Sequence, residues 1–110
     1  MQMTDRVREM IAAVEKKVEE KKMFGGLCFM VNDKMCVGVK EKGILVRIDP
    51  ALTDEVLEYE GTEVMVHGGL AVKGFIYVSA DVLKTKKQLA YWVDLALDFN
   101  KFAKSSKKKK

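Results

Sequence analysis

Hydrophobic residues near the N-terminus recur at helical spacing, with charged residues between them. The apolar positions three and four apart are Val7, Met10, Ile11, Val14 and Val18. This spacing places them on one face of a helix. In residues 15–22, opposite charges three and four apart are typical of a solvated helix face. The pattern therefore predicts a first helix over residues 4–22.

The pattern then changes to alternation, which is the period of β-strands. Residues 23–31, 35–39 and 44–48 each alternate and are rich in Val, Ile, Phe and Met. The short segments 32–34 and 41–43 separate them and contain Asn, Asp and Gly, which turns favour. Two short turns in succession predict an antiparallel meander of three strands.

The second half of the chain repeats the change from helix to strand to helix. Asp49-Pro50 is a favoured helix start, and a short helix with Leu52, Val56 and Tyr59 on its buried side is expected after it. Two further strands are expected at 64–67 and 72–78, joined across Gly68-Gly69 by a turn or a loop of several residues. A capping box at residues 85–88 begins a final helix that runs to about Phe102.

This order of elements predicts an α+β domain. The order is α-β-β-β-α-β-β-α, which gives two layers with an antiparallel sheet and helices on one face. Residues 1–103 form this single domain, and residues 104–110 are expected to be a disordered, lysine-rich tail. The length of 110 residues is ordinary for one domain with one hydrophobic core.

The distribution of charge along the chain is more informative about binding partners than the net charge. The net charge is +4, but the last ten residues hold six lysines and no acid. Residues 1–100 carry 14 basic and 16 acidic side chains, so the folded body is slightly acidic. Any non-specific contact with nucleic acid is therefore expected from the tail, through Lys107, Lys108, Lys109 and Lys110. The competing interpretation is a tail that only aids solubility.

Candidate chemistry along the chain is sparse. Cys28, Cys36 and His67 do not form a spacing typical of a metal site, and the two cysteines are expected to be buried, reduced thiols. The chain begins without an apolar signal segment and holds no apolar run long enough for a membrane span. We therefore expect a cytoplasmic protein that is no enzyme and takes no metal or cofactor.

Two features are candidates for interaction. The final helix carries a second apolar stripe, separate from its core-facing side, which consists of Tyr91, Leu95, Phe99 and Phe102. An exposed stripe of this kind is typical of an interface, so we expect a homodimer or another protein partner, although core packing could absorb it. Arg47 lies in an apolar strand, where it can pair with a carboxylate such as Asp49 or Glu63, or reach a ligand or partner chain.

Four segments in order give the chain a family resemblance. They are Met23-Phe24-Gly25-Gly26, Val46-Arg47-Ile48-Asp49, Lys73-Gly74-Phe75 and Tyr91-Trp92-Val93-Asp94. Together they resemble the N-terminal domain of the TfoX/Sxy family over roughly residues 5–100. The resemblance implies a fold like that of the secretion chaperones. It also implies a link to bacterial regulators of natural competence, which assist a transcription factor and carry a second domain that these residues do not include.

Three functions stay open at this stage. The first is a non-enzymatic protein-interaction domain, an accessory regulator of transcription or DNA competence. The second is a nucleic-acid-associated protein that acts through the basic tail. The third is a small-ligand-binding domain that uses the sheet face and Arg47, which a deep pocket at that residue would favour.

Overall fold

The computed structural model describes residues 3–23 and 26–103. Its helices are α1 (Met3–Ala12), α2 (Thr53–Val56) and α3 (Lys86–Asn100), with short 3-10 turns at Pro50–Leu52 and Ala80–Val82. Its strands are β1 (Val18–Met23), β2 (Gly26–Val31), β3 (Lys34–Lys40), β4 (Gly43–Arg47), β5 (Thr62–His67) and β6 (Leu70–Ser79). All neighbouring strands are antiparallel, in the order β1-β2-β3-β4-β6-β5. The predicted α+β class is confirmed.

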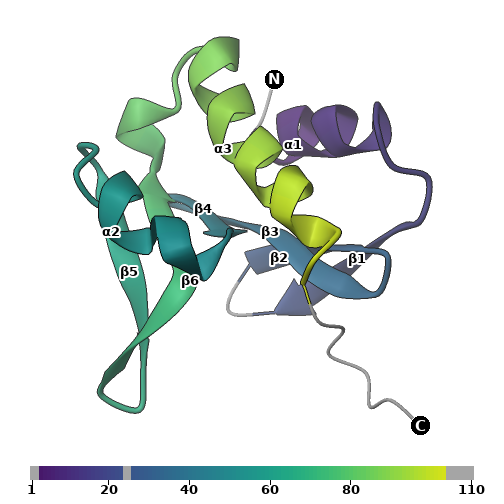
Figure 1. The fold of residues 1–110 in the computed structure, drawn as a ribbon. Coiled ribbons are helices and arrows are strands. Elements are labelled where there is room, and N and C mark those ends of the chain that lie inside the picture. The colour runs from purple at the N-terminus through teal and green to yellow at the C-terminus, as the bar shows by residue number, and fades with distance from the viewer. Residues whose placement is uncertain (1–2, 24–25, 104–110) are drawn as a thin grey trace, which may run out of the picture.

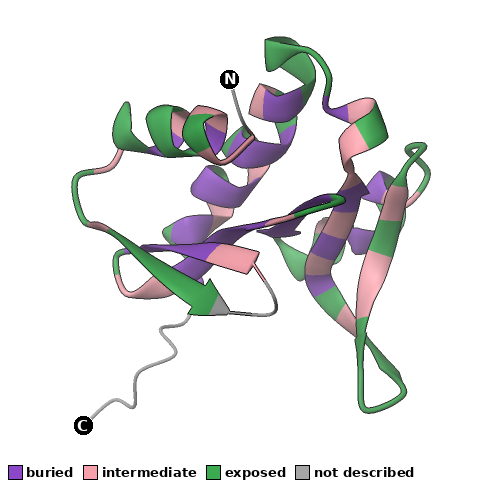
Figure 2. Cartoon of the chain, turned by 180° about the vertical axis from the view of Figure 1, so that it is seen from behind, coloured by how far each residue is buried: buried purple, intermediate pink, exposed green. Residues whose placement is uncertain are grey.

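The main core lies between the sheet and its helices (Figure 1). Phe29, Val37 and Val46 from the sheet are fully buried against Ile11 of α1 and Val93 of α3. Figure 2 shows the buried residues concentrated on the facing sides of these elements. Burying one large apolar side chain is worth roughly 1.5–3 kcal/mol, so this layer supplies the main driving force for folding.

The prediction of a helix over residues 4–22 is wrong in its second half. Helix α1 ends at Ala12, and residues 18–23 form β1, an edge strand paired with β2. Residues 18–23 form a strand rather than a helix because β2 is apolar on both faces and needs a hydrogen-bonding neighbour along its outer edge. Charged residues suit such an edge, so the sheet has a four-stranded meander where three strands were expected.

The turns follow the chemistry of their residues. Asn32 and Asp33 both have positive φ, which permits the tight connection between β2 and β3. Gly68 and Gly69 also have positive φ and join β5 to β6 directly, so the open choice between turn and loop resolves to a two-residue turn. The predicted capping box is confirmed, because Thr85 and Gln88 exchange hydrogen bonds of 2.9 and 3.0 Å.

A second apolar cluster lies on the face of the sheet away from the helices. It contains Cys28, Met30, Met35 and Leu45, each less than a tenth exposed, and half-buried Met65, Phe75 and Tyr77 pack around it. Gly38 leaves room beside Leu45 for the methyl group of Met35. The prediction of two buried thiols is confirmed, and the cysteines belong to opposite faces because Cys36 packs in the main core.

Candidate functional site

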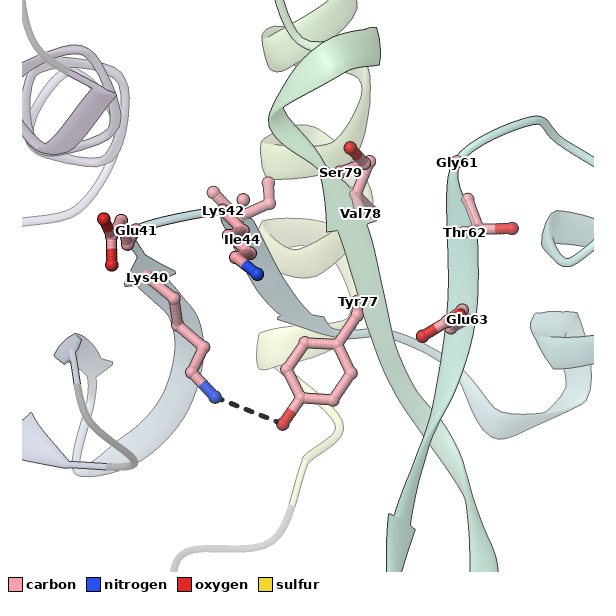
Figure 3. Close-up of a pocket in the computed structure, with 11 residues that line it drawn as sticks. Lys40, Glu41, Lys42, Ile44, Gly61, Thr62, Glu63, Tyr77, Val78 and Ser79 are labelled. Atoms are coloured by element: carbon pink, nitrogen blue, oxygen red, sulfur yellow. Dashed lines mark hydrogen bonds between the residues drawn. The ribbon is translucent and has the colours of Figure 1, made fainter.

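A hollow lies beside the turn between β3 and β4, between that turn and strands β5 and β6 (Figure 3). Its volume is about 700 Å³, which falls within the range of small-ligand sites. Its polar walls come from Lys40, Lys42, Thr62, Glu63 and Tyr77. Lys40 Nζ lies 3.5 Å from Tyr77 Oη and 4.9 Å from the centre of its ring. The hollow therefore combines an aromatic wall with charges of both signs.

Arg47 lies at the other end of β4 and does not line the hollow. Its guanidinium carbon is 5.4 Å from the centre of the Phe75 ring, the residue paired with it across β4 and β6. Burial lowers the pKa of Arg47 from its ordinary value, because the charged form loses hydration. The expected ion pair with a carboxylate stays a prediction, and the structure gives Arg47 a cation–π contact.

An aromatic cluster joins α3 to the segment after α2. It consists of Tyr59, Tyr91 and Trp92, whose ring centres are 5.1–5.8 Å apart. All three pairs meet edge to face, the arrangement that aromatic quadrupoles favour. Trp92 is buried, whereas Tyr59 and Tyr91 are 45% and 42% exposed. A groove of about 300 Å³ runs along them, lined also by Glu60, Val82 and Gln88.

The tyrosine hydroxyls hold the outer part of the cluster together. Tyr91 Oη donates a hydrogen bond of 3.3 Å to Tyr59 Oη. This hydrogen bond, with partial burial, raises the pKa of Tyr91 to about 12. The phenol therefore stays neutral at physiological pH and presents an apolar ring and a hydroxyl group together at the surface.

The groove has an acidic border. Glu60 lines it, and Glu55 is close enough to Tyr91 to help raise the pKa of that phenol. Asp54 and Glu58, on α2 and just after it, are also exposed acids. Residues 49–63 contain six acids and no base. Exposed aromatic rings bordered by carboxylates favour a partner that brings apolar groups and positive charge.

The stripe predicted on α3 is partly exposed. Tyr91 and Phe102 are exposed, the latter at 77%, whereas Leu95 and Phe99 are half-buried and Leu95 packs against the main core. The expectation that Tyr59 faces the core is wrong, because the chain turns after α2 and presents Tyr59 beside Tyr91. Sequence spacing could not reveal this, since the two tyrosines are 32 residues apart.

The remaining candidate groups lie apart from one another. Burial raises the pKa of Cys28 to about 11 and that of Cys36 to about 12. His67 is exposed at the end of β5. Across residues 3–23 and 26–103, no three His, Cys, Asp or Glu residues gather as metal ligands would. Lys107, Lys108, Lys109 and Lys110 lie outside the described residues, and within those residues no helix is long and apolar enough to cross a membrane.

Comparison with known proteins identifies the family. A search of the curated proteins found no match. The sequence model of the TfoX N-terminal domain matches residues 9–100, which spans every strand and all of α3. The match covers most of the 110 residues and agrees with the four segments that carry the resemblance. The chain therefore belongs to the TfoX N-terminal domain family.

Proposed function

We propose that this chain is a non-enzymatic protein-interaction domain that serves as an accessory regulator of transcription or DNA competence. The family is of regulatory, non-catalytic type and is related to competence. The observation that carries the proposal is the aromatic cluster of Tyr59, Tyr91 and Trp92 with its groove. Tyr and Trp are the residues most enriched where proteins bind each other.

The chemistry of the aromatic cluster and the acids beside it indicates the kind of partner that fits this surface. Two half-exposed tyrosines supply apolar area and hydroxyl groups. The buried ring of Trp92 packs against both tyrosine rings and holds them in position. Glu55 and Glu60 supply negative charge beside the tyrosines. A partner protein with a basic segment that carries Lys or Arg next to apolar residues fits both features.

A capture experiment with matched variants tests the proposal. The intact chain is immobilised in native lysate, and bound proteins are identified by mass spectrometry. In the double variant Tyr59→Ser, Tyr91→Ser, affinity for the specific partner falls about tenfold or more, because two central aromatic contacts are lost. Leu70→Ser is the control, because Leu70 is 73% exposed but lies on β6, away from the groove. Equal capture by both variants would contradict the proposal.

The hollow beside Lys40 supports a second candidate function, the binding of a small ligand on the sheet face. Lys40, Lys42 and the Tyr77 hydroxyl supply donors for an acidic group, and the Tyr77 ring supplies an apolar wall. A thermal-shift screen of small aromatic acids tests it, with Lys40→Met as the variant and Lys73→Met as an exposed control. Stabilisation that disappears only in Lys40→Met supports ligand binding, whereas the same response in both variants contradicts it.

A further inference from the structure

One edge of the sheet is open to strand pairing. Strand β5 is the last in the sheet order, and its only strand neighbour among the described residues is β6. Val66 of β5 is 62% exposed, and Leu70 across the hairpin is 73% exposed. An edge strand presents a row of backbone N–H and C=O groups that another strand can use. Apolar side chains beside such a row add burial to the hydrogen bonds.

The outer part of this hairpin also stands clear of the helices. Strand β4 pairs with β6 only from Phe75 to Ser79, so residues 65–73 form a two-stranded ribbon beyond it. Figures 1 and 2 show the ribbon projecting from the body, with its tip exposed. A second protein can therefore approach the outer edge of β5 without meeting α1 or α3.

The sequence of β5 is complementary to itself in the antiparallel direction. In a pairing centred on Met65, Val64 lies opposite Val66 of the second copy, and Met65 lies opposite its own equivalent. Glu63 then lies opposite His67 of the second copy, once on each side of the centre. An imidazole hydrogen-bonds a carboxylate whether it is neutral or charged, so this register gives Glu63 and His67 suitable partners.

Backbone geometry supports the same register. In a two-residue hairpin the closing residues, here His67 and Leu70, form a hydrogen-bonded pair. The register with β6 shifts between Val64 and Met65, where residues 73–75 of β6 have no partner on β5. Val64 and Met65 still pack on opposite faces of the sheet, so the alternation along β5 continues, and the backbone groups of Val64 and Val66 point to the open edge. In the register centred on Met65 these two residues are the ones that pair across the interface. The hydrogen-bonding groups of both copies therefore meet.

We propose that this chain forms a two-fold dimer in which β5 pairs antiparallel with β5 of a second copy, centred on Met65. The two sheets then become one continuous sheet, and the apolar edge is covered. A two-fold interface uses the same residues twice, which matches the complementarity of β5 with itself. This dimer does not use the aromatic cluster, which stays available to another protein.

Cysteine cross-linking tests the register. Directly opposite residues of a non-hydrogen-bonded pair have Cα atoms about 4.5 Å apart, within the range of a disulfide. Met65→Cys should therefore give a covalent dimer under mild oxidation. His67→Cys is the control, because the two copies of position 67 lie about 13 Å apart along the strands in this register. Both variants carry Cys28→Ala and Cys36→Ala as well, because Met65 packs against the cluster that contains Cys28.

The result for Met65→Cys decides the proposal. Efficient cross-linking of Met65→Cys with little from His67→Cys confirms the register. Equal cross-linking of the two variants, or none from Met65→Cys, overturns it. Circular dichroism checks that both variants are folded, because Met65 packs against the second apolar cluster whereas His67 is exposed.

A charge exchange tests the same interface in solution. His67→Glu places a carboxylate opposite Glu63, so the dissociation constant of the dimer rises about tenfold or more. Adding Glu63→Lys restores attraction and brings dimerisation back. Phe102→Glu, which changes an exposed residue after α3 and away from β5, leaves the dimer in place. Sedimentation equilibrium at tens of micromolar separates the dimer from the 12.4 kDa chain. A wild-type chain that stays monomeric there, or a double variant that stays as weak as His67→Glu, refutes the proposal.

Discussion

The two edge strands of the sheet differ in the side chains that flank their open edges. Strand β1 carries four consecutive charged residues, Glu19–Lys22, and Arg8 of α1 holds Glu20 at 2.6 Å. Strand β5, at the other edge of the sheet, carries the apolar run Val64-Met65-Val66. Charged side chains discourage a further strand from pairing, whereas apolar ones favour it. The composition of β1 therefore opposes strand pairing, whereas that of β5 favours the pairing proposed above.

The support behind each edge differs as well. Val18 of β1 packs against the main core under α1, so this edge is part of the folded body. The outer half of β5 depends on β6, and β6 is tied to the body at Gly74. The Gly74 N–H donates to the Thr53 Oγ1 at 2.8 Å, and its carbonyl accepts from the Ile48 N–H at 2.7 Å. Gly74 is therefore a buried attachment point of the ribbon, at the place where the pairing of β4 with β6 ends.

The largest expected effect comes from Gly74→Ala. Gly74 is buried with φ +91°, and an added Cβ would lie 3.0 Å from the Ile48 carbonyl oxygen and 3.2 Å from Pro50 Cγ. Strain and crowding together should lower the free energy of unfolding by about 2–4 kcal/mol. Denaturant titration measures this loss. Gly69→Ala is the control, because its φ is +81° but nothing lies within 4 Å, so only the strain of about 1–2 kcal/mol applies. Equal losses would show that crowding at Gly74 is unimportant.

A smaller effect is expected from Thr53→Val at the same attachment. The threonine is 2% exposed, and its hydroxyl accepts the Gly74 N–H. Valine leaves that buried N–H without its acceptor, which costs about 1–3 kcal/mol. Thermal unfolding checks the loss, and Thr53→Ser should keep most of the stability because it keeps the hydroxyl. A Val variant as stable as the Ser variant would mean that the hydrogen bond contributes little.

These attachment residues also show what sequence alone can predict. The Gly-Gly turn, the capping box and the alternation in β2 to β4 are local signals, and each predicts its element correctly. The misassigned β1 has no such signal, because a run of mixed Glu and Lys suits a helix surface and an edge strand equally well. Only the need of β2 for a neighbour decides between them, and that need is a property of the whole sheet.

The candidate sites divide in the same way. Tyr91 and Phe102 are predicted from helical spacing and are exposed, because periodicity reports which face a residue occupies. The prediction that Tyr59 is buried is wrong, since the direction of the chain after α2 depends on how the short helix packs on β6. The self-complementarity of β5 becomes visible only when the sheet order shows that β5 is an edge.

No large change in stability is expected from Phe102→Glu, which separates two possible dimers. Phe102 is 77% exposed and lies just after α3, in the apolar stripe from which the sequence predicts self-association. If the chain pairs through β5, this variant stays folded and dimeric in sedimentation equilibrium. A folded monomer would instead place the dimer on α3, as the stripe predicts, and would contradict pairing through β5.

The smallest expected effect lies at the charged edge, in Glu20→Gln. The hydrogen bond from Arg8 lowers the pKa of the Glu20 carboxyl below its ordinary value. A lowered folded-state pKa contributes stability above the ordinary pKa of about 4.3, and this contribution is lost as the pH falls through the lowered value. The wild-type chain should therefore unfold at a slightly higher temperature than the variant at pH 7, and the difference should vanish in acid. The difference is small because exposed ion pairs contribute little in water. Melting curves at neutral and acidic pH check this, and a difference that persists in acid would assign the effect to packing. Either way β1 keeps three of its four charges, so Glu20→Gln should not create a second pairing edge.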